Sequence, residues 1–285
     1  MQLDPTIFRA YDIRGIVPSQ LTADTAEQVG RAFATHLQPK TVVVGRDGRL
    51  TSPEFHARVL VGLTRSGVDV LDIGQVSTDV FYYACASRDL PGIMVTASHN
   101  PAEYNGFKTV RRMPELLLAT ELKDAVMKQT YKDGPTVGTV KRRNVTGEFL
   151  DHLLNIVPAA DIKPLKVAID TSNGMQGPIW EELAGRLPIT IIPLCFEPDG
   201  NFPNHGNDIV QPENQKLLRA AVKREQADLG LIFDPDGDRC LLVDDRGETV
   251  PGDFVTALLA VRMLERSPGS TIIYDVRASD AVPAI

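Results

Sequence analysis

The sequence predicts an α/β protein built from repeated units. Short apolar strands alternate along the chain with segments of helical periodicity, which is the pattern of α/β proteins. A weak internal repeat supports this organisation, because the expected strands at 42–47, 167–172 and 272–277 each end in a polar turn before an expected helix. With 285 residues, 43% of them hydrophobic, the chain can bury the cores of two or more domains.

The elements follow from local signals taken in chain order. A helix is expected at 22–37, with Thr22 as its cap, and another at 52–66, with Pro53 in its first turn. The expected strands are the apolar runs at 41–44, 68–72, 92–96, 166–170, 189–193 and 229–233. The basic, polar stretch 141–145 is typical of a boundary between units.

The stretch TASHNP at 96–101 follows an apolar strand and is expected to be a tight loop. Pro101 disfavours a helical conformation for Asn100, and the Asn105-Gly106 pair is a turn signal. The hydroxyl of Ser98, presented on such a bend, can be a nucleophile or a phosphoryl carrier. The alternative is that Ser98 and Asn100 only cap the turn through bonds to the nearby backbone.

Three alternating aspartates follow the apolar run at 229–233; they are Asp234, Asp236 and Asp238. Pro235 and Gly237 oppose a helix here, and in an extended or looped backbone alternate side chains point to one side. Because like charges repel, such a set favours a bound cation, and oxygen ligands suit Mg²⁺ or Ca²⁺. An EF-hand is excluded because the Gly and Glu that its calcium loop requires are absent from the required positions in this stretch. The alternative to a metal site is an acidic turn that is simply solvated.

Five ordered motifs resemble the α-D-phosphohexomutase family, of the phosphomannomutase/phosphoglucomutase type. They are FRAYDIRG (8–15), VGRDGR (44–49), the Ser98 loop, DGNFPNH (199–205) and DPDGDR (234–239). The resemblance implies repeated three-layer α/β domains with mixed sheets, two of them complete (1–144 and 145–250) and a third begun (251–285). The sugar loop of the family's third domain and the phosphate clamp of its fourth domain are not visible, so we expect domain IV to be absent and turnover to be impaired.

The resemblance also implies a reaction, an intramolecular phosphotransfer. Hexose 1-phosphate and hexose 6-phosphate, of mannose or glucose, would interconvert through a phosphoserine at Ser98 and a hexose 1,6-bisphosphate. Glucose 1,6-bisphosphate or mannose 1,6-bisphosphate would be the activator, and Mg²⁺ the metal. The implied metal ligands are Ser98, Asp234, Asp236 and Asp238; the implied catalytic residues are Ser98, Lys108, His99 and Arg239; the implied substrate-binding residues are Tyr11, Arg14, Asn100 and Arg277.

Some of these roles have structural alternatives. Lys108 would need a lowered pKa, caused by neighbouring cations, to act as a base, and it could instead be a solvated lysine. Arg14 and Arg239 suit phosphate, yet surface ion pairs are possible for both. Arg46, Asp47 and Arg49 are expected to fix the architecture near the Ser98 loop, while His205 is interpreted as part of a domain joint.

The sequence is also compatible with three other functions. A phosphatase of the haloacid dehalogenase type would use Asp234 as its nucleophile, because a strand running into an Asp-x-Asp loop resembles its first motif. A non-catalytic fragment or pseudo-enzyme would fold and bind metal without turnover. Phosphoglucosamine mutase is a further possibility within the same family.

The composition and net charge of the chain limit the classes of partner that it is expected to bind. A net charge of −7 argues against a nucleic-acid surface or an anionic membrane, and no leader-like or membrane-spanning segment is seen, so we expect a cytoplasmic protein. Beyond the hexose phosphate, self-association or a complementing C-terminal chain is conceivable. The three cysteines show no CxxC spacing and the five histidines no HExxH pattern, which predicts free thiols and no zinc site.

Overall fold

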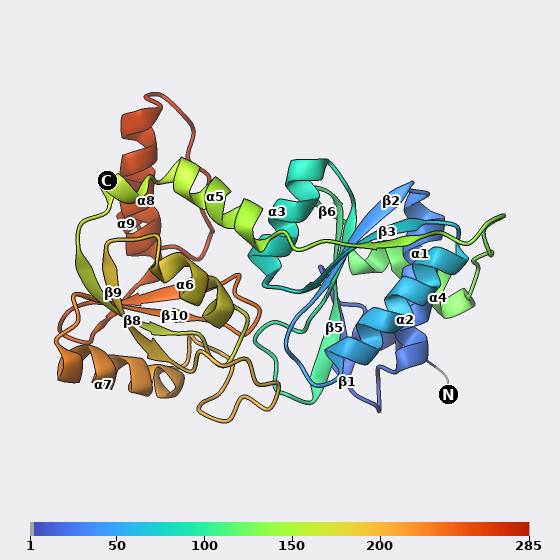
Figure 1. Ribbon diagram of the computed structural model, residues 1–285, viewed down its shortest axis with the longest axis horizontal. Coiled ribbons are helices and arrows are strands. Elements are labelled where there is room, and N and C mark those ends of the chain that lie inside the picture. The colour runs from blue at the N-terminus through green and yellow to red at the C-terminus, as the bar shows by residue number, and fades with distance from the viewer. Residues whose placement is uncertain (1–2, 285) are drawn as a thin grey trace.

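The computed structural model describes residues 3–284 and shows two α/β units side by side, joined by helix α5 (Thr146–Ile156), which lies between them (Figure 1). Each unit contains a mixed sheet covered by helices. The α/β fold class predicted from the alternation of strands and helices is therefore confirmed.

The sheet of the first unit runs in the order β1-β5-β4-β2-β3-β7, with β6 paired to β5. Its strands are β1 (Ile13–Ile16), β2 (Thr41–Arg46), β3 (Asp69–Gln75), β4 (Gly92–Val95), β5 (Tyr104–Arg112), β6 (Glu115–Leu116) and β7 (Val140–Arg142). The adjacent strands β4, β2, β3 and β7 run parallel to one another, whereas β5 is antiparallel to both β4 and β1. The carboxyl end of β4 thus leads directly into the Ser98 loop.

Helices cover both faces of this sheet; they are α1 (Ala23–Leu37), α2 (Ser52–Arg65), α3 (Thr78–Arg88) and α4 (Ala119–Lys128). Val42 and Val44 of β2 belong to the apolar core formed with α1, α2 and α4, while Val43 belongs to the core formed with α3 and α5. Successive strand residues face opposite sides of a sheet, so the first unit has three layers.

Helix α1 begins where the sequence predicts, because Thr22 caps it. The side-chain oxygen of Thr22 accepts from the backbone N–H of Thr25, and the backbone N–H of Thr22 donates to Thr25 Oγ1. Helices α1 and α2 pack very closely at glycines. A Cβ on Gly62 would lie 2.3 Å from the carbonyl oxygen of Glu27, and one on Gly30 would lie 2.8 Å from that of Val59. Larger residues would push the two helices apart.

The sheet of the second unit runs in the order β12-β11-β10-β8-β9. Its elements are β8 (Leu165–Asp170), α6 (Gln176–Ala184), β9 (Ile189–Leu194), α7 (Lys216–Glu225), β10 (Leu229–Phe233), β11 (Cys240–Val243) and β12 (Thr249–Val250). Short 3₁₀ turns lie at Pro5–Ile7, Ala159–Asp161 and Pro212–Gln215. The predicted strands at 166–170, 189–193 and 229–233 are confirmed to within a residue.

Helices also cover both faces of the second sheet. Leu218 and Val222 of α7 pack on Ile232, whereas Trp180 of α6 lies against Phe233, the next residue along β10. Helix α6 also faces the first unit, because its Ile179 belongs to the same apolar cluster as residues of α3 and α5. This shared cluster joins the two units.

The prediction of a turn at Asn105-Gly106 is wrong. Both residues lie within β5, where Gly106 pairs with Arg14 of β1. A Cβ on Gly106 would lie 2.2 Å from the carbonyl oxygen of Ile13, so glycine is needed for the close approach of two strands rather than for a reversal of the chain.

The prediction of a strand at 272–277 is also wrong. After helix α8 (Gly252–Arg266) this segment is irregular, with Ile273 and Val276 more than 90% exposed, and it leads to the short helix α9 (Ala281–Ala284). A strand needs a neighbour to satisfy its backbone groups, and none of the described residues supplies one. Across the described part of the chain, no helix has the length and apolarity required to span a bilayer.

Candidate active site

The buried guanidinium of Arg49 holds the Ser98 loop in place. The guanidinium of this buried residue donates to four backbone carbonyls of the loop and of the residues that follow it: Ser98 (2.7 Å), Asn100 (2.7 Å), Pro101 (2.7 Å) and Tyr104 (2.9 Å). Asp47, also buried, lies 3.3 Å from the Nε atom of Arg49 and balances its charge. The expectation that Asp47 and Arg49 fix the architecture near this loop is confirmed, and Arg46 contributes by donating to the backbone carbonyl of Asp47 over 3.1 Å.

Ser98 sits at the apex of the loop in a left-handed conformation, with φ of +48°, and its backbone N–H donates to Thr96 Oγ1. Few residues other than glycine adopt this conformation without cost, so the surrounding bonds hold it there. The hydroxyl of Ser98 donates to Asp234 Oδ2 over 2.7 Å and lies 3.3 Å from His99 Nδ1. The structure thus brings the serine of the first unit to the acidic loop of the second.

The three predicted carboxylates converge. Each of Asp234, Asp236 and Asp238 offers an oxygen within 4.8 Å of the others, and the first two side chains are fully buried. Asp236 Oδ2 accepts hydrogen bonds from Thr78, Thr96 and Lys108, whereas its buried Oδ1 has no partner among the described residues. An orphaned carboxylate oxygen within an all-oxygen set fits a hard divalent cation.

Lys108 pairs with two of these carboxylates. Its Nζ lies 2.7 Å from Asp236 Oδ2 and also contacts Asp238. Burial disfavours the ammonium, but the attraction of the two carboxylates outweighs it and raises the pKa of Lys108. The direction is opposite to the lowered pKa that a general base would need, because the nearest charges are anions rather than cations.

The acidic loop itself titrates unevenly. Burial and the repulsion of Asp236 and Asp238 raise the pKa of Asp234 well above its usual range. Burial also opposes ionisation of Asp236, yet Lys108 and Thr78 outweigh it and lower its pKa to about 2. Asp236 is therefore the fixed negative charge of the loop.

A cleft of about 470 Å³ opens over the serine. The predicted site residues that line it are Tyr11, Arg14, Ser98, His99, Lys108, Asp238 and Arg239, together with Arg9 and Tyr82, which were not predicted. Asn100 lines the adjoining cavity, of about 480 Å³, with His205 and Asn207. Arg277 lies apart from both; it is exposed, and its guanidinium pairs with Asp275 at 2.8 Å.

Cations dominate the mouth of this cleft. Burial and the nearby Arg239 lower the pKa of His99, so this imidazole is neutral near pH 7 and can accept or donate a hydrogen bond. Arg14 keeps an ion pair of 3.6 Å with Asp12, and both side chains remain partly exposed. A cleft of this kind, positive at its mouth and acidic at its base, suits an anionic ligand with a metal beneath it.

Further residues position the acidic loop, and sequence reasoning missed them. The backbone N–H of Thr78 donates to the carbonyl of Asp236 over 2.8 Å. Gln176 Nε2 bridges Asp79 (2.9 Å) and the carbonyl of Gly237 (3.0 Å). Thr78 and Asp79 begin α3 and Gln176 begins α6, so the loop is tied to helices of both units. No motif marks these residues; only the tertiary contact reveals them.

Comparison with protein-family models finds two matches. Residues 5–132 match the α/β/α domain I of phosphoglucomutase/phosphomannomutase, and residues 147–247 match its α/β/α domain II. The chain therefore contains two α/β/α domains of the phosphosugar mutase class, in which a serine loop faces an acidic loop across the junction between the domains.

Individual relatives agree with this class. A phosphomannomutase of Escherichia coli is 40% identical over 96% of this chain and 63% of its own length. A phosphomannomutase/phosphoglucomutase of Pseudomonas aeruginosa is 41% identical over 99% of this chain and 62% of its own. A solved structure from Burkholderia thailandensis, described as a phosphoglucomutase/phosphomannomutase family protein, superposes with a TM-score of 0.91 at 35% identity, covering 99% of this chain and 65% of that one.

The chain belongs to the phosphoglucomutase/phosphomannomutase family of α-D-phosphohexomutases. The resemblance seen in the sequence is thereby confirmed, as are its mixed-sheet α/β domains. The chain spans a little under two thirds of the length of the relatives that it matches.

Proposed function

We propose that this chain carries out the phosphoryl-transfer chemistry of a phosphohexomutase, an isomerase that interconverts hexose 1-phosphate and hexose 6-phosphate, of mannose or glucose, through a hexose 1,6-bisphosphate. The observation that carries the proposal is the position of Ser98, whose hydroxyl lies 2.7 Å from Asp234 at the base of a cleft rich in cations. The roughly 40% identity to mutases over nearly the whole chain supports it.

In the proposed step, the phosphoryl group of phosphorylated Ser98 passes to a hydroxyl of a bound hexose phosphate. The bond from phosphorus to the serine oxygen breaks, a bond to the sugar oxygen forms, and the sugar hydroxyl loses its proton while Ser98 regains one. The second half-reaction returns the other phosphoryl group to Ser98. Lys108 is the proposed proton donor and acceptor, since its Nζ reaches both the cleft and the acidic loop.

Arg14, Tyr11 and Arg239 are proposed to bind the phosphate and hydroxyl groups of the sugar at the mouth of the cleft, where guanidinium groups suit phosphate. His99 and Asn100 orient the serine loop. Arg277, from the segment after α8, is proposed to face substrate as well, although in the structure it pairs with Asp275.

The proposed metal is Mg²⁺, with Asp234, Asp236, Asp238 and a phosphoryl oxygen on Ser98 as ligands. When bound, it offsets charge on the transferring oxygens and on the three carboxylates. Lys108 would then be held less tightly as an ammonium, because the carboxylates that raise its pKa would share their charge. Glucose 1,6-bisphosphate or mannose 1,6-bisphosphate is the proposed activator that first loads Ser98.

Phosphopeptide mapping tests the proposal. The purified chain is incubated with glucose 1,6-bisphosphate and Mg²⁺, and its mass and peptides are compared with a sample that also contains a chelator. We expect a phosphoryl group on Ser98 that depends on Mg²⁺. Ser98→Ala should abolish it, whereas Ser87→Ala, on the exposed surface of α3, should not.

The location of the label separates the alternatives. A label on Asp234 would support the aspartyl-phosphate phosphatase instead, since that carboxylate would then be the nucleophile. A folded chain that acquires no phosphoryl group with either bisphosphate would contradict the proposal and identify a non-catalytic fragment.

A further inference from the structure

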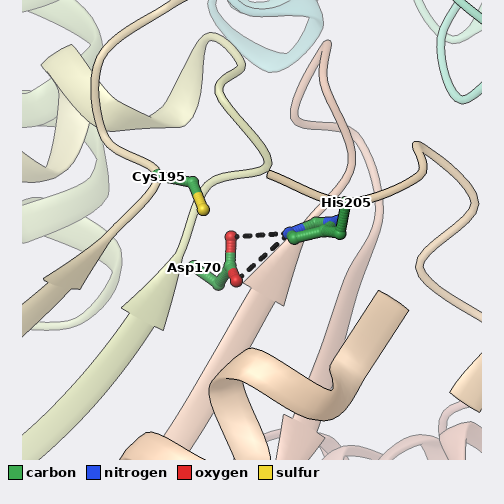
Figure 2. A group of neighbouring side chains, drawn as sticks. All are labelled: Asp170, Cys195 and His205. Atoms are coloured by element: carbon green, nitrogen blue, oxygen red, sulfur yellow. Dashed lines mark hydrogen bonds and ion pairs between the residues drawn. The ribbon is translucent and has the colours of Figure 1, made fainter. Parts of the chain in front are cut away.

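A second group of metal-ligating side chains lies in the second unit, away from the acidic loop. Figure 2 shows Asp170, Cys195 and His205 pointing toward one another, and their ligand atoms all lie within 4.8 Å of each other. Asp170 is the last residue of β8 and Cys195 follows β9, its parallel neighbour. His205 comes from the DGNFPNH loop, so three separate segments meet at one edge of the sheet.

The hydrogen bonds of His205 leave one ring nitrogen for this cluster. Its Nδ1 lies 2.9 Å from the carbonyl oxygen of Gly206, which can only accept, so Nδ1 carries a proton. Its Nε2 faces both oxygens of Asp170 at 3.2 Å. Metal-binding histidines show this arrangement, with one nitrogen donating to a carbonyl and the other directed at the metal.

Asp170 and His205 are largely shielded from solvent, whereas Cys195 is half-buried. The carboxylate of Asp170 is fully buried, and only 8% of the side chain of His205 is exposed. Asp170 Oδ1 accepts from the backbone N–H of Ser172, which fixes the carboxylate, while Asp170 Oδ2 has only His205 as a partner among the described residues. Imidazole Nε2 and carboxylate oxygens face each other here, so a cation, either a proton or a metal, must lie between them.

We propose that Asp170, Cys195 and His205 form a binding site for a zinc-class cation. One sulfur, one nitrogen and one oxygen ligand match the borderline-soft preference of Zn²⁺, and three protein ligands leave a fourth tetrahedral position for water. Mg²⁺ prefers the all-oxygen set at Asp234, Asp236 and Asp238, so the two clusters select different metals. Binding releases the thiol proton of Cys195 and the proton between His205 and Asp170.

Occupancy would fasten the 199–208 loop to the edge of the second sheet. Asn207, two residues beyond His205, donates its side-chain N–H to the carbonyl of Asn100 over 2.8 Å, and Phe202 lies over the Arg49 guanidinium at 5.1 Å. Both contacts end on the structure that holds Ser98. A cation at this cluster is therefore placed to stabilise the joint on which the serine loop rests.

Cobalt and zinc binding to the full 285-residue chain test the site. In buffer containing excess Mg²⁺, we expect Co²⁺ to give the near-ultraviolet absorption of a cobalt–thiolate bond, and dialysed protein to retain about one Zn²⁺ per chain. Zn²⁺ should also raise the melting temperature. Cys195→Ser and His205→Gln should lose all three effects, whereas Cys240→Ser, which alters an exposed thiol next to the acidic loop, should keep them.

Each contrary result is decisive. Absence of the thiolate band in the wild-type chain, or its persistence in Cys195→Ser, would overturn the proposal and leave an ordinary ion pair between His205 and Asp170. If His205→Gln fails to fold, Cys195→Ser alone decides, because exchanging sulfur for oxygen at this half-buried position preserves the shape of the side chain. Since neither variant touches Ser98 or the acidic loop, failure here would not bear on phosphoryl transfer.

Discussion

Replacing Arg49 by lysine should weaken the first unit far more than the same exchange does at the surface. Arg49 is buried and its fork meets four carbonyls of the serine loop. A lysine ammonium is a compact group that cannot span them, and we expect it to lose at least two. At about 1.5 kcal/mol for each charge-assisted bond, Arg49→Lys should lower the free energy of unfolding by about 3 kcal/mol.

Urea unfolding followed by circular dichroism measures this loss, and Arg58→Lys is the matched control. Arg58 pairs with Asp24 and Glu27 at the surface, where such pairs contribute about 1 kcal/mol or less. The loading of Ser98 by glucose 1,6-bisphosphate should also slow in Arg49→Lys, because the left-handed serine loses its support. Equal destabilisation by the two exchanges would refute the view that Arg49 holds the loop.

Three other predictions concern metal binding, pH and turnover. Thr78→Val keeps the side-chain volume but removes a hydrogen-bond donor to Asp236, so the affinity for Mg²⁺, measured by titration calorimetry, should fall by about tenfold. The control Thr35→Val, on the surface of α1, should leave that affinity unchanged. Burial opposes the charge on His205, but hydrogen bonds with Asp170 and Cys195 outweigh it and raise its pKa to about 10. With a chelator present, the ion pair between His205 and Asp170 should therefore contribute its full stabilisation below about pH 6.5, and the free energy of unfolding should fall by about 2 to 4 kcal/mol as the pH rises to 10. If the urea midpoint of His205→Gln falls with pH as steeply as that of the wild type, this prediction is contradicted. Turnover of mannose 1-phosphate by the 285-residue chain in a coupled assay should be far below that of the Pseudomonas aeruginosa relative, since the chain spans 62% of the length of that relative. Equal rates would show that these residues suffice.

The fold could be predicted where the signal was local. Thr22 marks the start of α1, and the apolar run ending at Phe233 defines β10, because capping and burial depend on residues close in the chain. The predictions at Asn105-Gly106 and at 272–277 were wrong, because strand pairing decided both. A turn-forming pair can lie in a strand that has a close neighbour, and an apolar run remains irregular when no neighbour is present.

The candidate site divides in the same way. Ser98 and the three aspartates stand in short motifs, so their convergence could be expected from the sequence. By contrast, Thr78 and Thr96, which donate to Asp236, lie well over a hundred residues from it in the chain. The sequence predicts no zinc site, because Asp170, Cys195 and His205 of the proposed cluster lie up to 35 positions apart and lack the short spacing by which zinc motifs are recognised.

The apolar cluster shared by α3, α5 and α6 has a consequence for the chemistry itself. Ser98, Thr78 and Lys108 lie in the first unit and the aspartates in the second, so every bond between them depends on how the two units are packed together. A small swing about the cluster would draw the serine oxygen away from its carboxylate without unfolding anything. The packing of Ile179, which is distant from Ser98 in the chain, therefore contributes to the alignment on which the proposed phosphoryl transfer depends.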